Sequence, residues 1–203
     1  IGNALLKALF YEQIPLIALG LLLVVTLYFF FATSDQQKRE KRLKLFVMLS
    51  LGFRAIYALL LSIGQYVVWS QDKFTKLLLP PGQPISYFLF YIWGRFWLNV
   101  VIITGVSFIW YVILKALSRY RSSLFEAGEL KLGFLCAFLV GWPSVVIFIP
   151  TFFITTVLVS LARGAFLKKQ FTTIGIPLAI AAILTFICGA KVIEWLHLGV
   201  LNI

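Results

Sequence analysis

The sequence predicts an all-α fold, a polytopic transmembrane helical bundle with about six membrane-crossing helices in a single membrane domain (1–203). Of its 203 residues, 62% are hydrophobic and only 12% are charged, whereas soluble domains contain about 45–50% apolar residues. The mean hydropathy is +1.00. Several uncharged stretches reach the ~20 residues that a helix needs to cross the hydrocarbon core of a bilayer. These observations indicate an integral membrane protein.

Apolar length and helix breakers divide the chain into elements. The run from Leu130 to Ala162 would extend about 50 Å as one helix, which is too long for an ordinary span. Pro143 in "GWP" divides it, because proline is tolerated in a first helical turn and disfavoured inside a helix. The predicted helices cover residues 13–33, 45–69, 96–114, 130–142, 144–162 and 173–193.

Two other segments are expected outside the spans. Residues 1–12 could form a short interfacial helix. Residues 70–95 contain three prolines and many aromatic residues, so we expect an outer loop with Trp69, Trp93 and Trp97 in the aromatic belt at the membrane surface.

The basic residues predict the orientation. The net charge is +11, and most Lys and Arg residues fall in three clusters between apolar stretches, which are "SDQQKREKRLK" (34–44), "KALSRYRSSLFEAGELK" (115–131) and "ARGAFLKK" (162–169). The positive-inside rule places all three clusters on the cytoplasmic side of the membrane. The expected membrane is the inner (plasma) membrane of a prokaryote. We expect contact with membrane lipids and no nucleic-acid partner, and the clusters could also meet anionic lipid or an acidic partner.

Common catalytic motifs are missing from the sequence. It has one histidine, two cysteines (Cys136 and Cys188) and no HExxH, CxxC or GxSxG motif. These absences argue against zinc hydrolysis, thiol redox chemistry and a serine triad. No metal and no cofactor are therefore predicted.

The few acidic residues are the remaining candidates. Asp35 is the first charge after the first predicted helix, and Glu129 directly precedes the fourth. Both are expected at the cytoplasmic boundary, where two carboxyls could share a proton, as in the dyad that activates water in aspartic proteases. Spacing alone leaves an alternative in which these acids are solvated or paired with Arg and Lys.

Residues 128–142, "GELKLGFLCAFLVGW", resemble the core of the prepilin peptidases. This type IV leader peptidase family of GxGD membrane aspartic proteases has the approximate pattern GxGDxKLxxxxGxxxGW. The matching positions are Gly128, Lys131, Leu132, Gly141 and Trp142. Farther along, "TTIGIPLAIAAIL" (172–184) is similar to the family's IPFGPxLAxA stretch, with Gly175 in register and the proline moved one place to Pro177.

The resemblance implies a catalytic pair formed by Asp35 and Glu129. The expected substrate is a protein with a basic leader and an apolar transmembrane helix, cut at the cytoplasmic face. Glu129 replaces the family's second aspartate and Glu126 replaces its first glycine, and the 203 residues show no counterpart of the N-terminal zinc and methyltransferase domain. The added methylene moves the carboxyl by over ~1 Å, and such a displacement can cost about 100-fold in rate.

The sequence therefore leaves three functions open. One is a divergent aspartic peptidase with reduced or lost activity. Another is a noncatalytic membrane subunit or helix-binding scaffold of a pilus, secretion or other membrane complex, in which Glu126 and Glu129 receive basic residues from a partner. A third is a small-solute transporter, suggested by broken helices and by Arg54 in the second helix.

Arg54 is expected about 15 Å inside the membrane boundary, where an unpaired cation is costly. It should face protein and either pair with Asp35 or another polar group in a water-filled cleft, or contact a substrate or a partner. Snorkelling toward the headgroups is the alternative.

Overall fold

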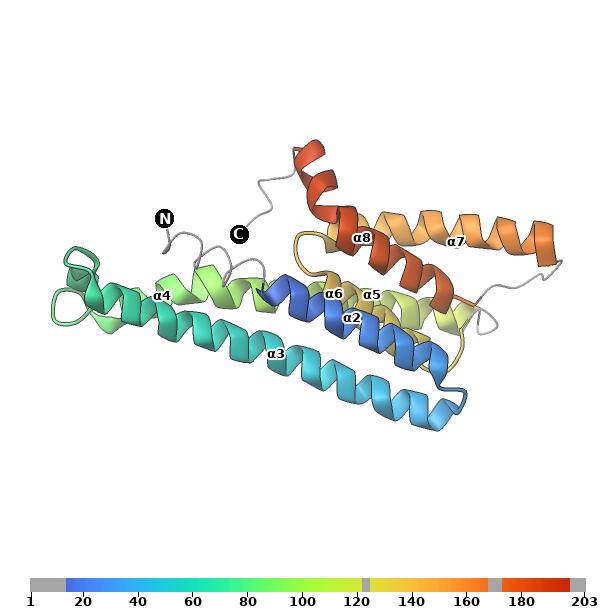
Figure 1. Ribbon diagram of the computed structural model, residues 1–203, viewed down its shortest axis with the longest axis horizontal. Coiled ribbons are helices and arrows are strands. Elements are labelled where there is room, and N and C mark those ends of the chain that lie inside the picture. Colours follow the sequence, from blue (N-terminus) through green and yellow to red (C-terminus); the bar gives the residue numbers. More distant parts are fainter. Residues whose placement is uncertain (1–13, 122–124, 168–172, 198–203) are drawn as a thin grey trace. The chain divides into compact units, whose positions relative to one another are not determined.

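The computed structural model describes residues 14–121, 125–167 and 173–197 (Figure 1). The all-α prediction is confirmed, because the described residues form helices joined by turns and contain no strand. The interfacial helix predicted over 1–12 lies outside these residues. The elements are α2 (Ile14–Ala32), α3 (Gln36–Gln71), η2 (Thr75–Leu78), α4 (Ile85–Ile92), η3 (Trp93–Trp97), α5 (Leu98–Tyr120), α6 (Glu129–Val140), α7 (Val145–Leu167) and α8 (Gly175–Trp195).

Within the described residues, five helical stretches are long and apolar enough to cross a membrane. They are Ile14–Ala32, Gln36–Gln71, Ile85–Tyr120, Val145–Ala165 and Gly175–Trp195. The chain is an integral membrane protein, and the apolar faces of these helices contact lipid. Helix α6 differs from them, since its 12 residues extend only about 18 Å.

The helix boundaries differ from the sequence-based ones in two regions. Helix begins at Ile85 inside the predicted outer loop over 70–95, because the three prolines all precede it and "ISYFLFYIWGRFW" contains no further proline. Helix α3 begins at Gln36 and includes the charged segment predicted as a loop. Lys, Arg and Glu favour helix, and the Asp35 side chain caps the first turn by accepting the Gln37 N–H at 2.9 Å.

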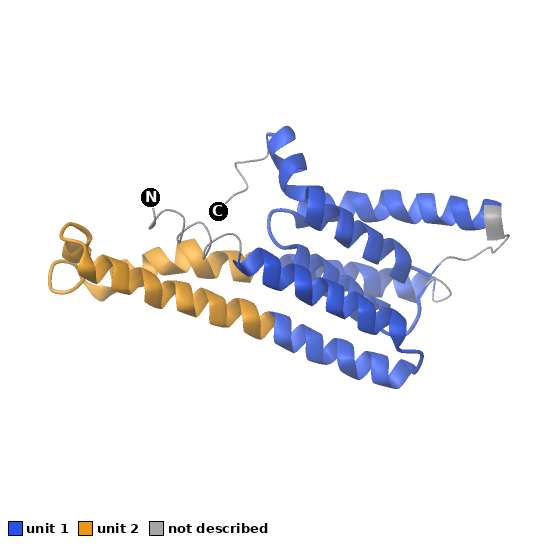
Figure 2. Cartoon of the chain, viewed as in Figure 1, with its two compact units in different colours: residues 1–50, 103–202 blue, residues 51–102, 203 orange. Residues whose placement is uncertain are grey.

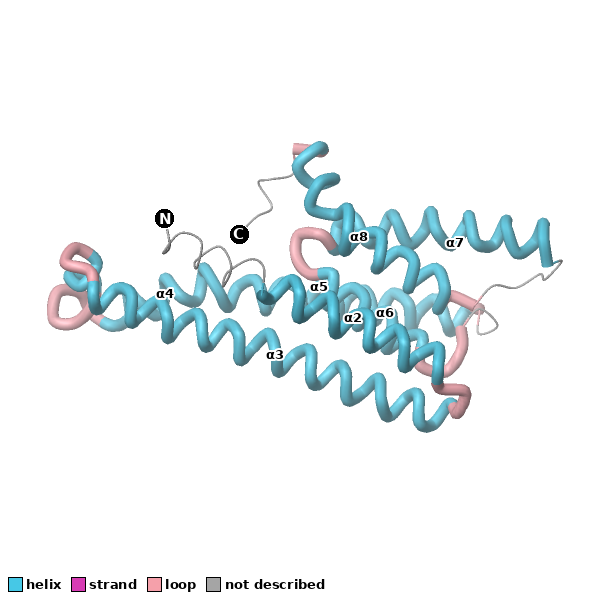
Figure 3. Tube along the Cα trace, in the orientation of Figure 1, coloured by secondary structure: helices cyan, strands magenta, loops and turns pink. Residues whose placement is uncertain are grey.

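The sequence predicts one domain, whereas contacts divide the described chain into two compact units (Figure 2). Unit 1 comprises residues 1–50 and 103–202, and unit 2 comprises residues 51–102 and 203. In unit 2, the second half of α3 and the stretch beginning at α4 are joined by a loop that Figure 3 shows at one end of both helices.

Helix α6 is the centre of unit 1. It contacts α2, α7 and α8, and its residues from Leu135 to Leu139 are fully buried. At its far end the chain turns at residues 141–144, where Gly141 has a positive φ of 84°, before α7 begins. A helix so enclosed holds its first residue, Glu129, in a fixed place.

Candidate functional site

Glu129 joins two parts of unit 1 that are distant in sequence. Its side chain is 1% exposed. Its Oε2 atom accepts a hydrogen bond from the Glu126 N–H at 2.8 Å, and its Oε1 atom accepts one from the Gly175 N–H at 2.6 Å. The Glu129 N–H in turn donates to the Glu126 carbonyl oxygen at 3.2 Å. The carboxyl therefore closes the turn over residues 126–129 and fastens it to the start of α8.

Two glycines make this arrangement possible. Gly128 has φ 92°, a left-handed conformation that costs a residue with a Cβ about 1–2 kcal/mol. At Gly175 a Cβ would lie 2.8 Å from Glu129 Oε1 and 3.0 Å from the Phe30 ring, so only glycine allows the carboxyl to approach the backbone. Both glycines are positions on which the predicted resemblance to the prepilin peptidases rests.

The pKa of Glu129 is raised above its usual value of 4.5. Burial is the largest cause, since it disfavours the charged form, and the nearby Glu126 carboxyl acts in the same direction. The hydrogen bonds from the Glu126 and Gly175 N–H groups oppose the shift but do not cancel it. Glu129 precedes α7 and α8 and lies outside the five candidate spans.

This shift predicts a pH-dependent stability. Because the folded pKa lies above the unfolded value of 4.5, the folded state binds the proton more tightly, so the stabilisation is complete below pH 4.5 and is lost as the pH rises through the folded pKa. We expect the thermal midpoint of the wild-type protein in detergent, measured relative to Glu129→Gln, to fall across this window and then level off. A difference that increases with pH would contradict the assignment.

Asp35 has a different environment. Its Oδ1 atom accepts from the Gln37 and Lys38 N–H groups at 2.9 and 3.3 Å, and Oδ2 lies 3.6 Å from Lys38 Nζ. Its side chain is 49% exposed. The hydrogen bond from the Lys38 backbone is the main cause that lowers the pKa of Asp35. Asp35 is thus an exposed helix cap, and its role in a shared-proton pair with Glu129 stays a prediction.

Arg39, one helical turn beyond Asp35, makes the contacts to the 126–129 turn. Its Nη1 atom lies 3.6 Å from Glu126 Oε2, and its guanidinium lies 4.9 Å from the centre of the Phe30 ring. The Arg39 side chain is only 11% exposed. In the sequence, Arg39 is one of several basic residues in the predicted cytoplasmic cluster over 34–44. No pattern in the sequence indicated that Arg39, rather than a neighbouring basic residue, contacts the 126–129 turn.

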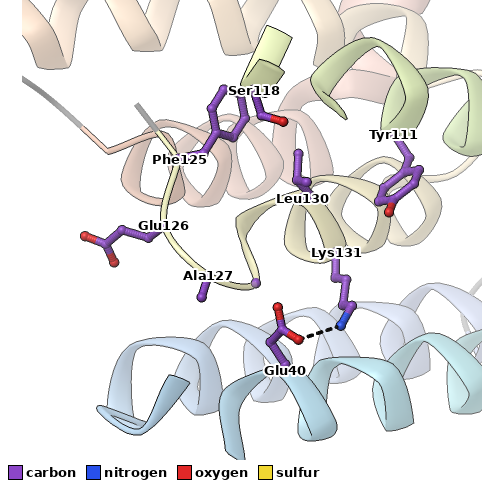
Figure 4. Close-up of a pocket in the computed structure, with 9 residues that line it drawn as sticks. Glu40, Tyr111, Ser118, Phe125, Glu126, Ala127, Leu130 and Lys131 are labelled. Atoms are coloured by element: carbon purple, nitrogen blue, oxygen red, sulfur yellow. Dashed lines mark hydrogen bonds and ion pairs between the residues drawn. The ribbon is translucent and has the colours of Figure 1, made fainter. Parts of the chain in front are cut away.

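A pocket of about 360 Å³ lies beside this turn (Figure 4). Tyr111 and Ser118 of α5 line it together with Phe125 and the start of α6. Lys131 Nζ and Glu40 Oε2 form an ion pair at 3.3 Å in its wall. The Glu40 and Glu126 side chains are about half exposed. Their carboxylates are therefore accessible from the pocket, whereas the carboxyl of Glu129 is buried.

The other residues of the predicted motif lie in the helix core and at helix ends. Leu132 is fully buried in α6, and Gly141 and Trp142 lie in the turn at the opposite end of α6 from Glu129. Pro177 is in the first turn of α8, and its carbonyl oxygen accepts a hydrogen bond from Thr155 Oγ1 at 3.3 Å. These residues support the fold rather than the carboxyl site.

Arg54 lies in α3, within unit 2. About 28 Å of continuous helix, at about 1.5 Å per residue, separates it from Asp35, so the expected pairing of Arg54 with Asp35 is wrong. Among the described residues, no group of three or more His, Cys, Asp or Glu side chains is placed to hold a metal ion. Comparisons with protein-family models, curated proteins and solved structures find no match to this chain.

Proposed function

We propose that this protein is a membrane-embedded, noncatalytic relative of the prepilin peptidases that binds the transmembrane helix of a partner. The burial of Glu129 carries the proposal. A carboxyl that activates water must lie within hydrogen-bond reach of that water, whereas both oxygens of Glu129 accept backbone N–H groups and its side chain is 1% exposed. Its role is to hold the 126–129 turn against α8.

A basic flank of the partner helix would meet two carboxylates beside the pocket, in exchange for their present ion pairs with Lys131 and Arg39. Glu40 and Glu126 present half-exposed carboxylates at the same end of unit 1, beside the apolar and aromatic side chains of Leu130 and Phe125. Exposed ion pairs contribute only about 0–1 kcal/mol each, so these acids would orient the partner. Packing of its apolar helix against the bundle would supply most of the affinity.

An aspartic peptidase is the second candidate. Asp35 and Glu129 have pKa shifts of opposite direction, and a dyad needs one protonated and one ionised carboxyl. The motif spacing around Gly128 also favours it. This function requires an opening of the 126–129 turn that brings Glu129 into contact with water.

A single substrate tests cleavage. The purified protein, reconstituted into vesicles, is incubated with a prepilin-like polypeptide that has a basic leader and an apolar helix. We expect no product, and the same result for Asp35→Asn and Glu129→Gln, while an active prepilin peptidase cuts the same preparation. Cleavage by the wild type that disappears in both variants would replace the proposal with the second candidate.

The same polypeptide tests binding. A photo-crosslinker at Phe125 should capture it, and capture should fall about two- to tenfold in Glu40→Gln/Glu126→Gln, as expected for two exposed ion pairs. Glu194→Gln, which changes an exposed acid on α8, is the matched control and should have no effect. If a polypeptide with neutral flanks is captured equally well, the basic flank is not recognised.

A further inference from the structure

The loop between α3 and α4 is a folded cap. Trp69, Leu79 and Phe88 are buried together, and the Trp69 ring packs against Phe88 with ring centres 5.4 Å apart. The Asp72 Oδ2 atom accepts hydrogen bonds from the Thr75 N–H and the Thr75 hydroxyl, both at 3.0 Å. We call residues 69–93 the hairpin tip. Its internal contacts fix which side chains it presents outward.

The hairpin tip presents an apolar pair beside a basic pair. Phe74 is 83% exposed and Leu77 is 67% exposed. Phe74 directly precedes the 3₁₀ helix η2 and Leu77 lies within it. Residues three apart in a 3₁₀ helix lie on the same face. Lys73 and Lys76 are likewise three apart and exposed. Although the cap buries three other large apolar side chains, it holds these two outside, next to two cations.

The exposed apolar surface continues from the membrane-spanning part of unit 2 into the hairpin tip. It includes Ile63, Tyr66 and Val67 on α3, Leu89 and Phe90 on α4, and Trp93 at the start of η3. From Leu45 to Gln71, α3 extends about 40 Å, compared with a hydrocarbon core of about 30 Å and a whole bilayer of about 40–45 Å. The end of α3 therefore reaches the depth of the headgroups.

We propose that the hairpin tip inserts Phe74 and Leu77 into the headgroup layer of the bilayer that α3 crosses, while Lys73 and Lys76 bind anionic headgroups. Within the tip, two exposed basic side chains, Lys73 and Lys76, oppose one acidic side chain, Asp72, so the net charge of the tip is positive and fits an anionic surface. Aromatic residues such as Trp93 prefer the same depth. The tip thereby anchors unit 2 at the membrane surface, at the end of α3 opposite its basic N-terminal segment.

Spin labelling of the whole chain tests this anchor. A label is placed at Phe74→Cys, and separately at Leu77→Cys, after replacement of Cys188 by alanine. Cys136 can stay because it is fully buried. Each variant is reconstituted into vesicles of phosphatidylcholine alone or mixed with phosphatidylglycerol. Neither labelled residue belongs to the core of the tip, so the cap should remain folded. A label at the exposed Gln37 is the aqueous control.

In mixed vesicles, labels at positions 74 and 77 should collide more readily with oxygen than with a water-soluble nickel chelate, and the control should show the reverse. Lys73→Gln/Lys76→Gln should lower the ratio of immersed to water-exposed label on the order of tenfold. Preferential collision with nickel would overturn the anchor, and shielding from both reagents would indicate a protein contact instead. Immersion that is unchanged by lipid charge and by the lysine variant would overturn binding to anionic headgroups.

Discussion

Replacing Glu129 by alanine is expected to lower the free energy of unfolding by about 2–4 kcal/mol. The substitution leaves the N–H groups of Glu126 and Gly175 without their acceptors, and an unsatisfied buried donor costs about 1–3 kcal/mol. Loss of the packed methylenes adds a cavity. The loss can be measured from denaturant titration in detergent, followed by circular dichroism.

Glu126→Ala is the matched control for this measurement. It removes the carboxylate that lies 3.6 Å from Arg39. It keeps the backbone N–H of residue 126, which donates a hydrogen bond to Glu129. Because that carboxylate is about half exposed, its ion pair should contribute only about 0–1 kcal/mol. If Glu129→Ala is no more destabilising than Glu126→Ala, then the buried hydrogen bonds of Glu129 do not hold the turn.

The membrane-spanning character of the chain could be predicted because bilayer thickness imposes a minimum apolar length on every span. The helix boundaries were less predictable. The three prolines before Ile85 indicated a loop, yet the aromatic residues after it form helix from Ile85 onward, since no proline follows them in this stretch. The charged start of α3 likewise resembled a loop, although its Lys, Arg and Glu residues favour helix when Asp35 caps the first turn.

The candidate site shows a similar division. Motif spacing selected Glu129 and Gly175 separately, but it could not predict that the carboxyl of one accepts the N–H of the other, because that contact depends on how α6 and α8 pack. The burial of Glu129 and the contact of Arg39 with Glu126 likewise depend on how the helices pack, which motif spacing does not show. The paired action of Asp35 and Glu129 stays a prediction.

Gly175→Ala should produce the second large effect, a loss of about 1–3 kcal/mol in the free energy of unfolding, as is typical when a packed site is overfilled. The new Cβ would lie 2.8 Å from Glu129 Oε1 and 3.0 Å from the Phe30 ring. The carboxyl would have to move, which would break its 2.6 Å hydrogen bond to the Gly175 N–H. Gly164→Ala is the control, because a Cβ there meets nothing within 4 Å and alanine favours helix by about 1 kcal/mol.

A double-mutant cycle separates the carboxyl contact from the contact with Phe30. If the clash with Glu129 is the main cost, then Gly175→Ala should be less destabilising in the Glu129→Ala background, with a coupling energy in the range of about 0.5–3 kcal/mol found for residues in contact. Equal costs in the two backgrounds would assign the effect to Phe30 alone. A strong coupling would show that the carboxyl depends on close approach to the α8 backbone, and this is the property that distinguishes a structural glutamate from a residue poised to activate water.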